Sequence, residues 1–206
     1  MREHSMKFLV CAVLLQTGCA SNTPDTDAGM WWMDASVDGA ADATMDAAMD
    51  AAVADSLVVN EIHAIGDDWV EIFNAGAAPV SLTHLRLADS DSMGLPDQGA
   101  AVDLGPAGSL DPGAYLVVLA NLGGSANSGV QTDCSPLDVP RCLEASFGIS
   151  DSRGDVLFLI DSSDTVLSRV DYPPNTTDAT QTYGRLPDGT GPFLVTVPTP
   201  GAANMR

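Results

Sequence analysis

The chain has 206 residues and a formal net charge of −20 at pH 7, with 28 acidic side chains against 8 basic ones. This length is sufficient for one ordinary domain and an additional tail. Proteins neutralise the phosphate backbone of nucleic acids with Lys and Arg, so we expect no nucleic-acid partner for so acidic a chain. Direct adhesion to anionic lipid is disfavoured for the same reason.

Residues 1–18 have the composition of a secretory signal peptide. Basic side chains precede an apolar run over 8–15, and Thr17-Gly18 supply small residues for cleavage. The run is too short to cross a membrane, which takes about 20 apolar residues. Cys19 follows directly, which resembles the bacterial lipoprotein signal, although Gln16 stands where that signal usually has Leu.

This resemblance implies that Cys19 becomes the lipidated N-terminus of an exported protein. We therefore expect attachment to the cell envelope of a Gram-negative bacterium, at the outer membrane or the cell surface. Contact with the membrane would come from the acyl chains on Cys19. The alternative is plain secretion with an unmodified cysteine.

Residues 19–56 comprise Cys19 and an acidic, Ala- and Asp-rich stretch that contains neither Lys nor Arg. Asp recurs at every fourth position from Asp34 to Asp50, a spacing that would stack like charges along one face of a helix. Few large apolar residues are present to form a core. We expect a disordered tether that lifts the following domain off the membrane, with a marginal helix over 40–54 as the alternative.

From residue 57 onward, short apolar runs alternate with turn residues, and no helix-length stripe of 3.6-residue period occurs. This pattern predicts a two-sheet antiparallel β-sandwich, preceded by the disordered tether. The expected strands cover residues 57–63, 69–74, 80–87 (broken), 101–104, 114–120, 156–161, 165–172, 183–185 and 193–197.

Cys134 and Cys142 form an even pair in a chain expected to be exported, since Cys11 lies in the signal. Export favours a disulfide, which the chain-entropy model values at about 2.5 kcal/mol for so short a loop. The alternative is two free thiols. A metal site is disfavoured, because no His or further Cys stands nearby to complete four ligands.

Five groups of short motifs follow one another along the β-rich part. They are Val-Val-Asn-Glu-Ile (58–62) with Asp-Trp-Val-Glu-Ile-Phe-Asn (68–74), Leu-Asp-Pro-Gly-Ala-Tyr-Leu-Val (110–117), Phe-Gly-Ile-Ser-Asp-Ser (147–152), Tyr-Gly-Arg-Leu-Pro-Asp-Gly (183–189) and Thr-Pro-Gly-Ala-Ala-Asn (199–204). In this order they resemble the lamin-tail domain family as found in exported bacterial proteins. The resemblance implies an immunoglobulin-like sandwich over 57–206 and a non-catalytic module, with no catalytic residues to carry over.

The chain departs from that family in two places. Thr83-His84-Leu85 stands where a Gly-Trp pair is usual, and residues 122–144, with the cysteine pair, look like an insertion. A stapled loop on a common scaffold is where a function particular to this chain would lie. The candidate recognition residues of this loop are Leu137, Val139, Arg141 and Leu143.

Two functions from different classes remain open. The first is a surface binding or scaffold module with a protein or glycan partner, and the second is a purely structural envelope protein without a specific ligand. They differ in whether the loop exposes apolar side chains around Leu137, Val139 and Leu143.

Paired carboxylates provide the main candidate for chemistry. Glu61 and Glu71 are expected in neighbouring strands, where they could serve general acid/base catalysis or hold a cation. The favoured alternative is that they accept hydrogen bonds from loop backbone and close the end of the sandwich. A hydrolase would require both carboxylates to open onto a cleft of substrate size.

Two further constellations are weaker. Asp67, Asp68, Asp89 and Asp91 would form an acidic cluster if the first loops converge, and residues 89–94 resemble the start of a calcium loop. That loop lacks its third ligand and closing Glu, so solvated loop charges are favoured over a weak calcium site in an adhesion module.

His63 and His84 are expected on adjacent strands, where histidines are more often surface or satisfied residues than parts of a hydrolytic site. The sequence has no G-x-S-x-G, H-E-x-x-H or phosphate loop. We therefore expect no enzyme, and no cofactor other than calcium.

Overall fold

The computed structural model describes residues 56–122 and 129–206. The predicted signal peptide, Cys19, the tether up to residue 55 and the alternative helix over 40–54 lie outside the described residues. No helix within the described ranges is long and apolar enough to cross a membrane.

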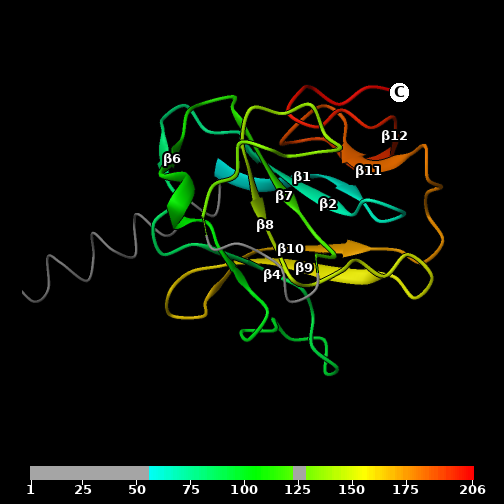
Figure 1. Cartoon of the computed structure of the whole chain (residues 1–206), viewed down its shortest axis with the longest axis horizontal. Helices are drawn as coiled ribbons and strands as arrows, with labels where there is room; N and C mark the ends of the chain where they lie inside the picture. Colours follow the sequence, from blue (N-terminus) through cyan, green and yellow to red (C-terminus); the bar gives the residue numbers. More distant parts are fainter. Residues whose placement is uncertain (1–55, 123–128) are drawn as a thin grey trace, which may run out of the picture. The chain divides into compact units, whose positions relative to one another are not determined.

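A six-stranded sheet forms one layer of the fold (Figure 1). Its order is β12-β11-β1-β2-β7-β8, and all neighbours are antiparallel except β7 and β8, which run parallel. The strands are β1 (Leu57–His63), β2 (Trp69–Asn74), β7 (Tyr115–Leu119), β8 (Cys142–Glu144), β11 (Thr182–Arg185) and β12 (Phe193–Thr196).

A four-stranded antiparallel sheet forms the second layer, in the order β10-β9-β4-β5. Its strands are β4 (Arg86–Ala88), β5 (Val102–Asp103), β9 (Asp155–Ile160) and β10 (Val166–Tyr172). A two-stranded ribbon of β3 (Val80–Ser81) and β6 (Ser109–Leu110) and the 3-10 helix η1 (Gly105–Ala107) complete the regular structure of the described chain. The predicted immunoglobulin-like β-sandwich is confirmed.

The main core lies between the two sheets. Alternate residues of each strand point to the same side, so β1 and β2 bury Ile62, Val70 and Ile72 against Leu157 and Leu159 of β9. Burying each such side chain contributes roughly 1.5–3 kcal/mol to the free energy of unfolding. Hydrophobic alternation therefore accounts for the strands and for the face of each strand that is buried.

The predicted strands are found, with small shifts at their ends. The broken strand over 80–87 becomes β3 and β4, which belong to different sheets. The sequence reading missed β6 and β8, which have only two and three residues. Since β8 is the edge strand beside β7, the predicted loop over 122–144 is corrected: its last three residues belong to the sheet.

The outer face of the six-stranded sheet also carries apolar side chains. Trp69, Val117 and Leu119 form a second buried cluster with Cys134 and Val139. The disulfide-bonded loop thus covers this face.

Candidate functional site

Glu61 and Glu71 lie directly opposite each other on β1 and β2. Both side chains are fully buried, with 0% of their surface exposed. They stand on the face turned away from Ile62 and Val70, because neighbouring residues of a strand point to opposite sides. A buried carboxylate is costly unless hydrogen bonds satisfy its oxygens.

Backbone and side chains of the C-terminal segment, residues 199–204, supply many of those hydrogen bonds. Gly201 N donates to Glu71 Oε2 at 2.7 Å, and Thr199 Oγ1 donates to Glu61 Oε2 at 3.0 Å. Asn60 Nδ2 donates to Glu71 Oε1 at 3.0 Å. These contacts agree with the favoured interpretation that the pair accepts hydrogen bonds from loop backbone, but the pair lies on the outer face of the six-stranded sheet and not at the end of the sandwich.

Asn204 fastens the same segment to the sheet. Its Nδ2 donates to the backbone oxygens of Asn60, at 3.2 Å, and Arg185, at 2.9 Å. Its Oδ1 lies 3.0 Å from Thr199 Oγ1. The segment therefore bonds to β1, β2 and β11 at once.

Burial dominates the electrostatics of the pair. Desolvation raises the pKa of Glu61 to about 7 and that of Glu71 to about 8, although hydrogen bonds from Thr199 and Asn60 oppose the rise. Neither carboxylate opens onto a cleft, so the pair does not meet the requirement for a hydrolase. We call Glu61 and Glu71 the acid pair: both carboxyl groups are closed off from solvent and form hydrogen bonds within the chain.

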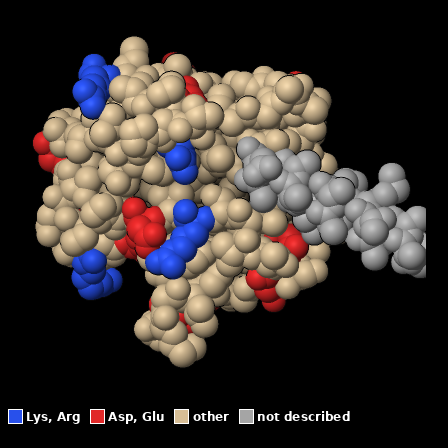
Figure 2. Space-filling view, turned by 180° about the vertical axis from the view of Figure 1, so that it is seen from behind, with Lys and Arg blue, Asp and Glu red and all other residues tan. Residues whose placement is uncertain are grey.

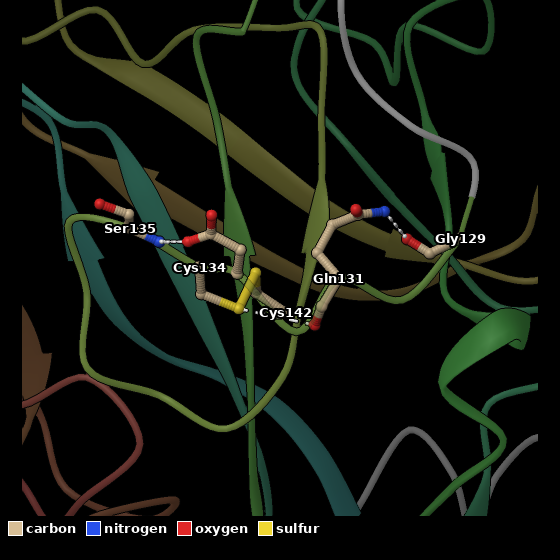
Figure 3. The surroundings of a disulfide bond; sticks show 6 residues. Gly129, Gln131, Cys134, Ser135 and Cys142 are labelled. Atoms are coloured by element: carbon tan, nitrogen blue, oxygen red, sulfur yellow. Dashed lines mark hydrogen bonds between the residues drawn. A yellow bond between two sulfur atoms is a disulfide. The ribbon is translucent and has the colours of Figure 1, made fainter.

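Cys134 and Cys142 are joined by a disulfide, as predicted, with their Cα atoms 5.9 Å apart (Figure 3). Backbone bonds between Gln131 and Cys142, of 2.8 and 3.1 Å, hold the start of the loop against β8. Figure 3 also shows Gln131 Nε2 bonded to Gly129 O. Ser135 N donates to the carboxylate of Asp133. The loop is therefore closed by the disulfide and by its own hydrogen bonds.

The apolar candidate recognition residues of this loop are buried or half-buried. Val139 and Leu143 are buried, and Leu137 is half-buried against the Trp69 cluster. Arg141 turns back, and its Nη1 donates to Ala107 O at 3.2 Å. The physical reason is that Trp69 points away from the main core and needs an apolar cover, which the loop provides.

The disulfide-bonded loop that covers Trp69 contacts the C-terminal segment at Gly201. Gly201 has a φ of 77°, a conformation that favours glycine, and a Cβ there would lie 3.2 Å from Val139 Cγ1. The disulfide loop and the C-terminal segment therefore pack side by side over the outer face.

The lamin tail domain family model matches residues 50–174. The chain belongs to the lamin tail domain family. No curated protein matches it. The matched range includes the acid pair and the disulfide loop and ends after β10, so the motifs over 183–189 and 199–204 lie beyond it.

The four acidic residues proposed for calcium are not assembled into one ligand set in this lamin tail domain. Asp68 Oδ2 accepts a hydrogen bond of 3.0 Å from Ile149 N, and Asp91 Oδ1 accepts bonds from its own loop. Burial and a hydrogen bond with Asp155 raise the pKa of Asp89 to about 8. Over 56–122 and 129–206, no three His, Cys, Asp or Glu side chains are grouped to hold a metal ion.

The two histidines do not lie on adjacent strands, since His63 belongs to β1 and His84 to a turn. His63 of β1 stacks on Trp69 with ring centroids 5.8 Å apart. His84, in the turn before β4, lines a hollow of about 640 Å³ with Arg86 and Asp103. The paired-histidine hydrolytic site is therefore not formed.

The sequence reading missed an exposed apolar tip between β4 and β5. Met93 is 77% exposed and Leu95 57% exposed. Figure 1 shows the segment between these strands projecting from the four-stranded sheet. Figure 2, which views the molecule from behind, shows a projection at the corresponding place on the lower side of the surface. The sequence did contain a signal for this exposed tip, because an apolar Met and an apolar Leu stand inside a turn rich in Ser and Asp.

Hydrogen bonds hold this tip in one conformation. Asp91 Oδ1 accepts bonds from Met93 N, at 2.8 Å, and Leu95 N, at 3.0 Å. Asp91 N donates to Leu95 O at 2.7 Å, and Ser90 Oγ donates to Asp155 Oδ1 at 3.2 Å. The side chains of Met93 and Leu95 are thus presented to solvent on a preorganised turn.

Proposed function

We propose that this lamin tail domain is a non-catalytic binding or scaffold module, anchored to the cell envelope by acyl chains on Cys19. The signal-like leader, with Cys19 directly after Thr17-Gly18, supports the anchor. The sealed Glu61 and Glu71 pair supports the absence of catalysis, because their oxygens accept hydrogen bonds within the chain.

The ordered apolar tip carries the binding role. An apolar contact costs less entropy on binding when its conformation is already fixed, and Asp91 fixes the backbone of Met93 and Leu95. Two acidic side chains, Asp91 and Asp97, flank the tip. The partner that suits it is a surface with an apolar pocket and a basic rim.

A purely structural envelope protein is the second candidate. The observation in its favour is that Val139 and Leu143 of the stapled loop are buried, so the loop stabilises the domain instead of offering an apolar surface. The two candidates make different predictions for the exposed tip.

The anchor is tested by the intact mass of the protein in the membrane fraction of its native host. We expect the mass of two or three acyl chains on the mature chain, lost in Cys19→Ala and kept in the matched variant Cys11→Ala. An unmodified chain in the medium would contradict the anchor and would show that the protein is a freely secreted β-sandwich.

The binding role is tested by a photo-crosslinking amino acid at position 93 on the cell surface, with the same group at position 166 as control. Val166 is also exposed but lies on β10. Adducts at 93 alone support the binding module. No adducts, or equal adducts at both positions, favour the structural protein.

A further inference from the structure

The hollow beside His84 lies at the base of the β4 and β5 hairpin, at the end away from the exposed tip. Its volume of about 640 Å³ is within the range of sites for small molecules. Three segments form its walls: the turn before β4 with His84, the end of β5 with Asp103, and the turn between β9 and β10 with Asp164. A backbone hydrogen bond of 2.9 Å from Leu104 N to Leu85 O joins the first two walls.

Charged side chains of the hollow keep hydrogen-bonding groups that the protein does not use. Arg86 lies directly opposite Asp103 across the two strands. In the described part of the chain Arg86 bonds only through Nη2, to Asp161 O at 3.2 Å and to Asp164 Oδ1, so its Nε and Nη1 remain as donors. Asp103 Oδ1 accepts a hydrogen bond of 2.8 Å from Gly105 N. Within the same described ranges, the Oδ2 atoms of Asp103 and Asp164 remain as acceptors.

Two residues of these walls have a backbone conformation that favours glycine. His84 has a φ of 68° and Asp164 a φ of 66°. Among the residues that the structure describes, four other than glycine have a positive φ, and two of these four lie at this one hollow. Such conformations persist where the surrounding structure holds them, and they cluster at ligand sites. The fold therefore holds both side chains at the hollow at a cost in backbone energy.

The mixed charges of the hollow select a class of ligand. Asp103 and Asp164 would repel a phosphate or a carboxylate, and Arg86 would repel an ammonium group. A neutral ligand with several hydroxyl groups meets neither repulsion, because hydroxyls donate to carboxylates and accept from a guanidinium. Pro106 and the ring of His84 add less polar surface, on which the C–H face of a sugar ring can lie.

We propose that this hollow binds a neutral sugar, as a mono- or disaccharide unit of a glycan. The free oxygens of Asp103 and Asp164 accept hydrogen bonds from sugar hydroxyls, and Arg86 donates to a further sugar oxygen. The site depends neither on the anchor at Cys19 nor on the exposed tip between β4 and β5. Its test and the tests of the proposed function therefore fail separately.

Saturation-transfer NMR of the full exported chain, carrying Cys19→Ala to remove any acyl chains, measures the binding. The probes are glucose, galactose, mannose and disaccharides of each. The uronic acid and the 2-amino sugar of each ring are the charged counterparts, which place an anion or a cation on the same framework.

His84→Gly separates binding from stability. Glycine adopts a φ of 68° without strain, so this variant removes the imidazole and keeps the turn. Asp103→Asn removes one charge, while its Oδ1 still accepts from Gly105 N. Asn175→Gly is the matched control, because Asn175 is exposed, has a φ of 52° and lies outside the hollow. Thermal unfolding checks that each variant is folded.

We expect a neutral sugar to bind with a Kd of about 1 mM or lower, and its charged counterparts to bind at least tenfold more weakly. His84→Gly and Asp103→Asn should each weaken binding at least tenfold, while Asn175→Gly and Met93→Ala leave it unchanged. His84→Gly decides the test if Asp103→Asn fails to fold. The proposal is overturned if no neutral sugar binds up to about 10 mM, or if a charged counterpart binds as tightly. Binding that survives His84→Gly, or that Asn175→Gly weakens equally, also overturns it.

Discussion

At the scale of single residues, Glu71 shows how burial sets the behaviour of a carboxylate. Its pKa is raised from 4.5 to about 8, mainly by desolvation. Between these values the folded state keeps a proton that the unfolded chain releases, so stability falls as the pH rises through this window. Each pKa unit corresponds to about 1.4 kcal/mol, so the expected loss is several kcal/mol.

Glu71→Gln removes this titration while keeping the shape of the side chain. At pH 5 we expect the variant to be less stable by about 1–2 kcal/mol, because an amide nitrogen replaces one acceptor oxygen. At pH 9 we expect this difference to vanish or reverse. Urea unfolding at both pH values measures it, and an equal dependence on pH in the two proteins would contradict the assignment. Glu61 retains its own smaller dependence in both.

Asp89 provides a second residue-scale prediction. Burial and the neighbouring Asp155 raise its pKa to about 8, so its contribution to stability also falls as the pH rises from 3.8 toward that value. We expect Asp89→Asn to reduce the pH dependence of the free energy of unfolding between pH 5 and 9. Asp91→Asn is the control, and an equal effect of both variants would argue against a special role for the Asp89–Asp155 pair.

At the scale of elements, the disulfide loop acts as the cover of the outer face. We expect Cys134→Ser with Cys142→Ser to lower the free energy of unfolding by about 2–3 kcal/mol. The indole of Trp69 should also become accessible to acrylamide, measured by fluorescence in a background of Trp31→Phe and Trp32→Phe. Unchanged quenching of Trp69 would show that the cover holds without its disulfide.

The C-terminal segment is the second covering element. Deleting residues 199–206 removes the donors from Thr199 and Gly201 and opens the acid pair to water. We expect the domain to lose stability and the pKa values of Glu61 and Glu71 to fall toward 4.5, measured by carboxylate NMR titration. Unchanged pKa values in the folded, truncated protein would contradict this role.

At the scale of the whole molecule, net charge opposes compaction. The chain carries −20, and the two ion pairs found in the described ranges are on the surface, where such pairs contribute about 0–1 kcal/mol. Salt screens the repulsion. We expect the melting temperature to rise between 0.05 and 0.5 M NaCl, by roughly a few degrees. A fall would mean that specific ion pairs outweigh the net charge.

The sequence by itself determined most of the strands, the sandwich and the disulfide. Alternation and turn residues are local signals, so 57–63 and 69–74 could be assigned without knowing their neighbours. An even cysteine pair in a chain expected to be exported was likewise enough to predict the Cys134–Cys142 bond.

The tertiary structure alone decided what those residues do. Gly201 meets Glu71 across 130 positions of sequence. Leu137 and Val139 turn inward because Trp69 faces outward, and β8 joins the sheet in parallel although it has only three residues. The physical reason is that hydrogen bonding and burial depend on which distant segments meet, and periodicity along the chain carries no record of that meeting.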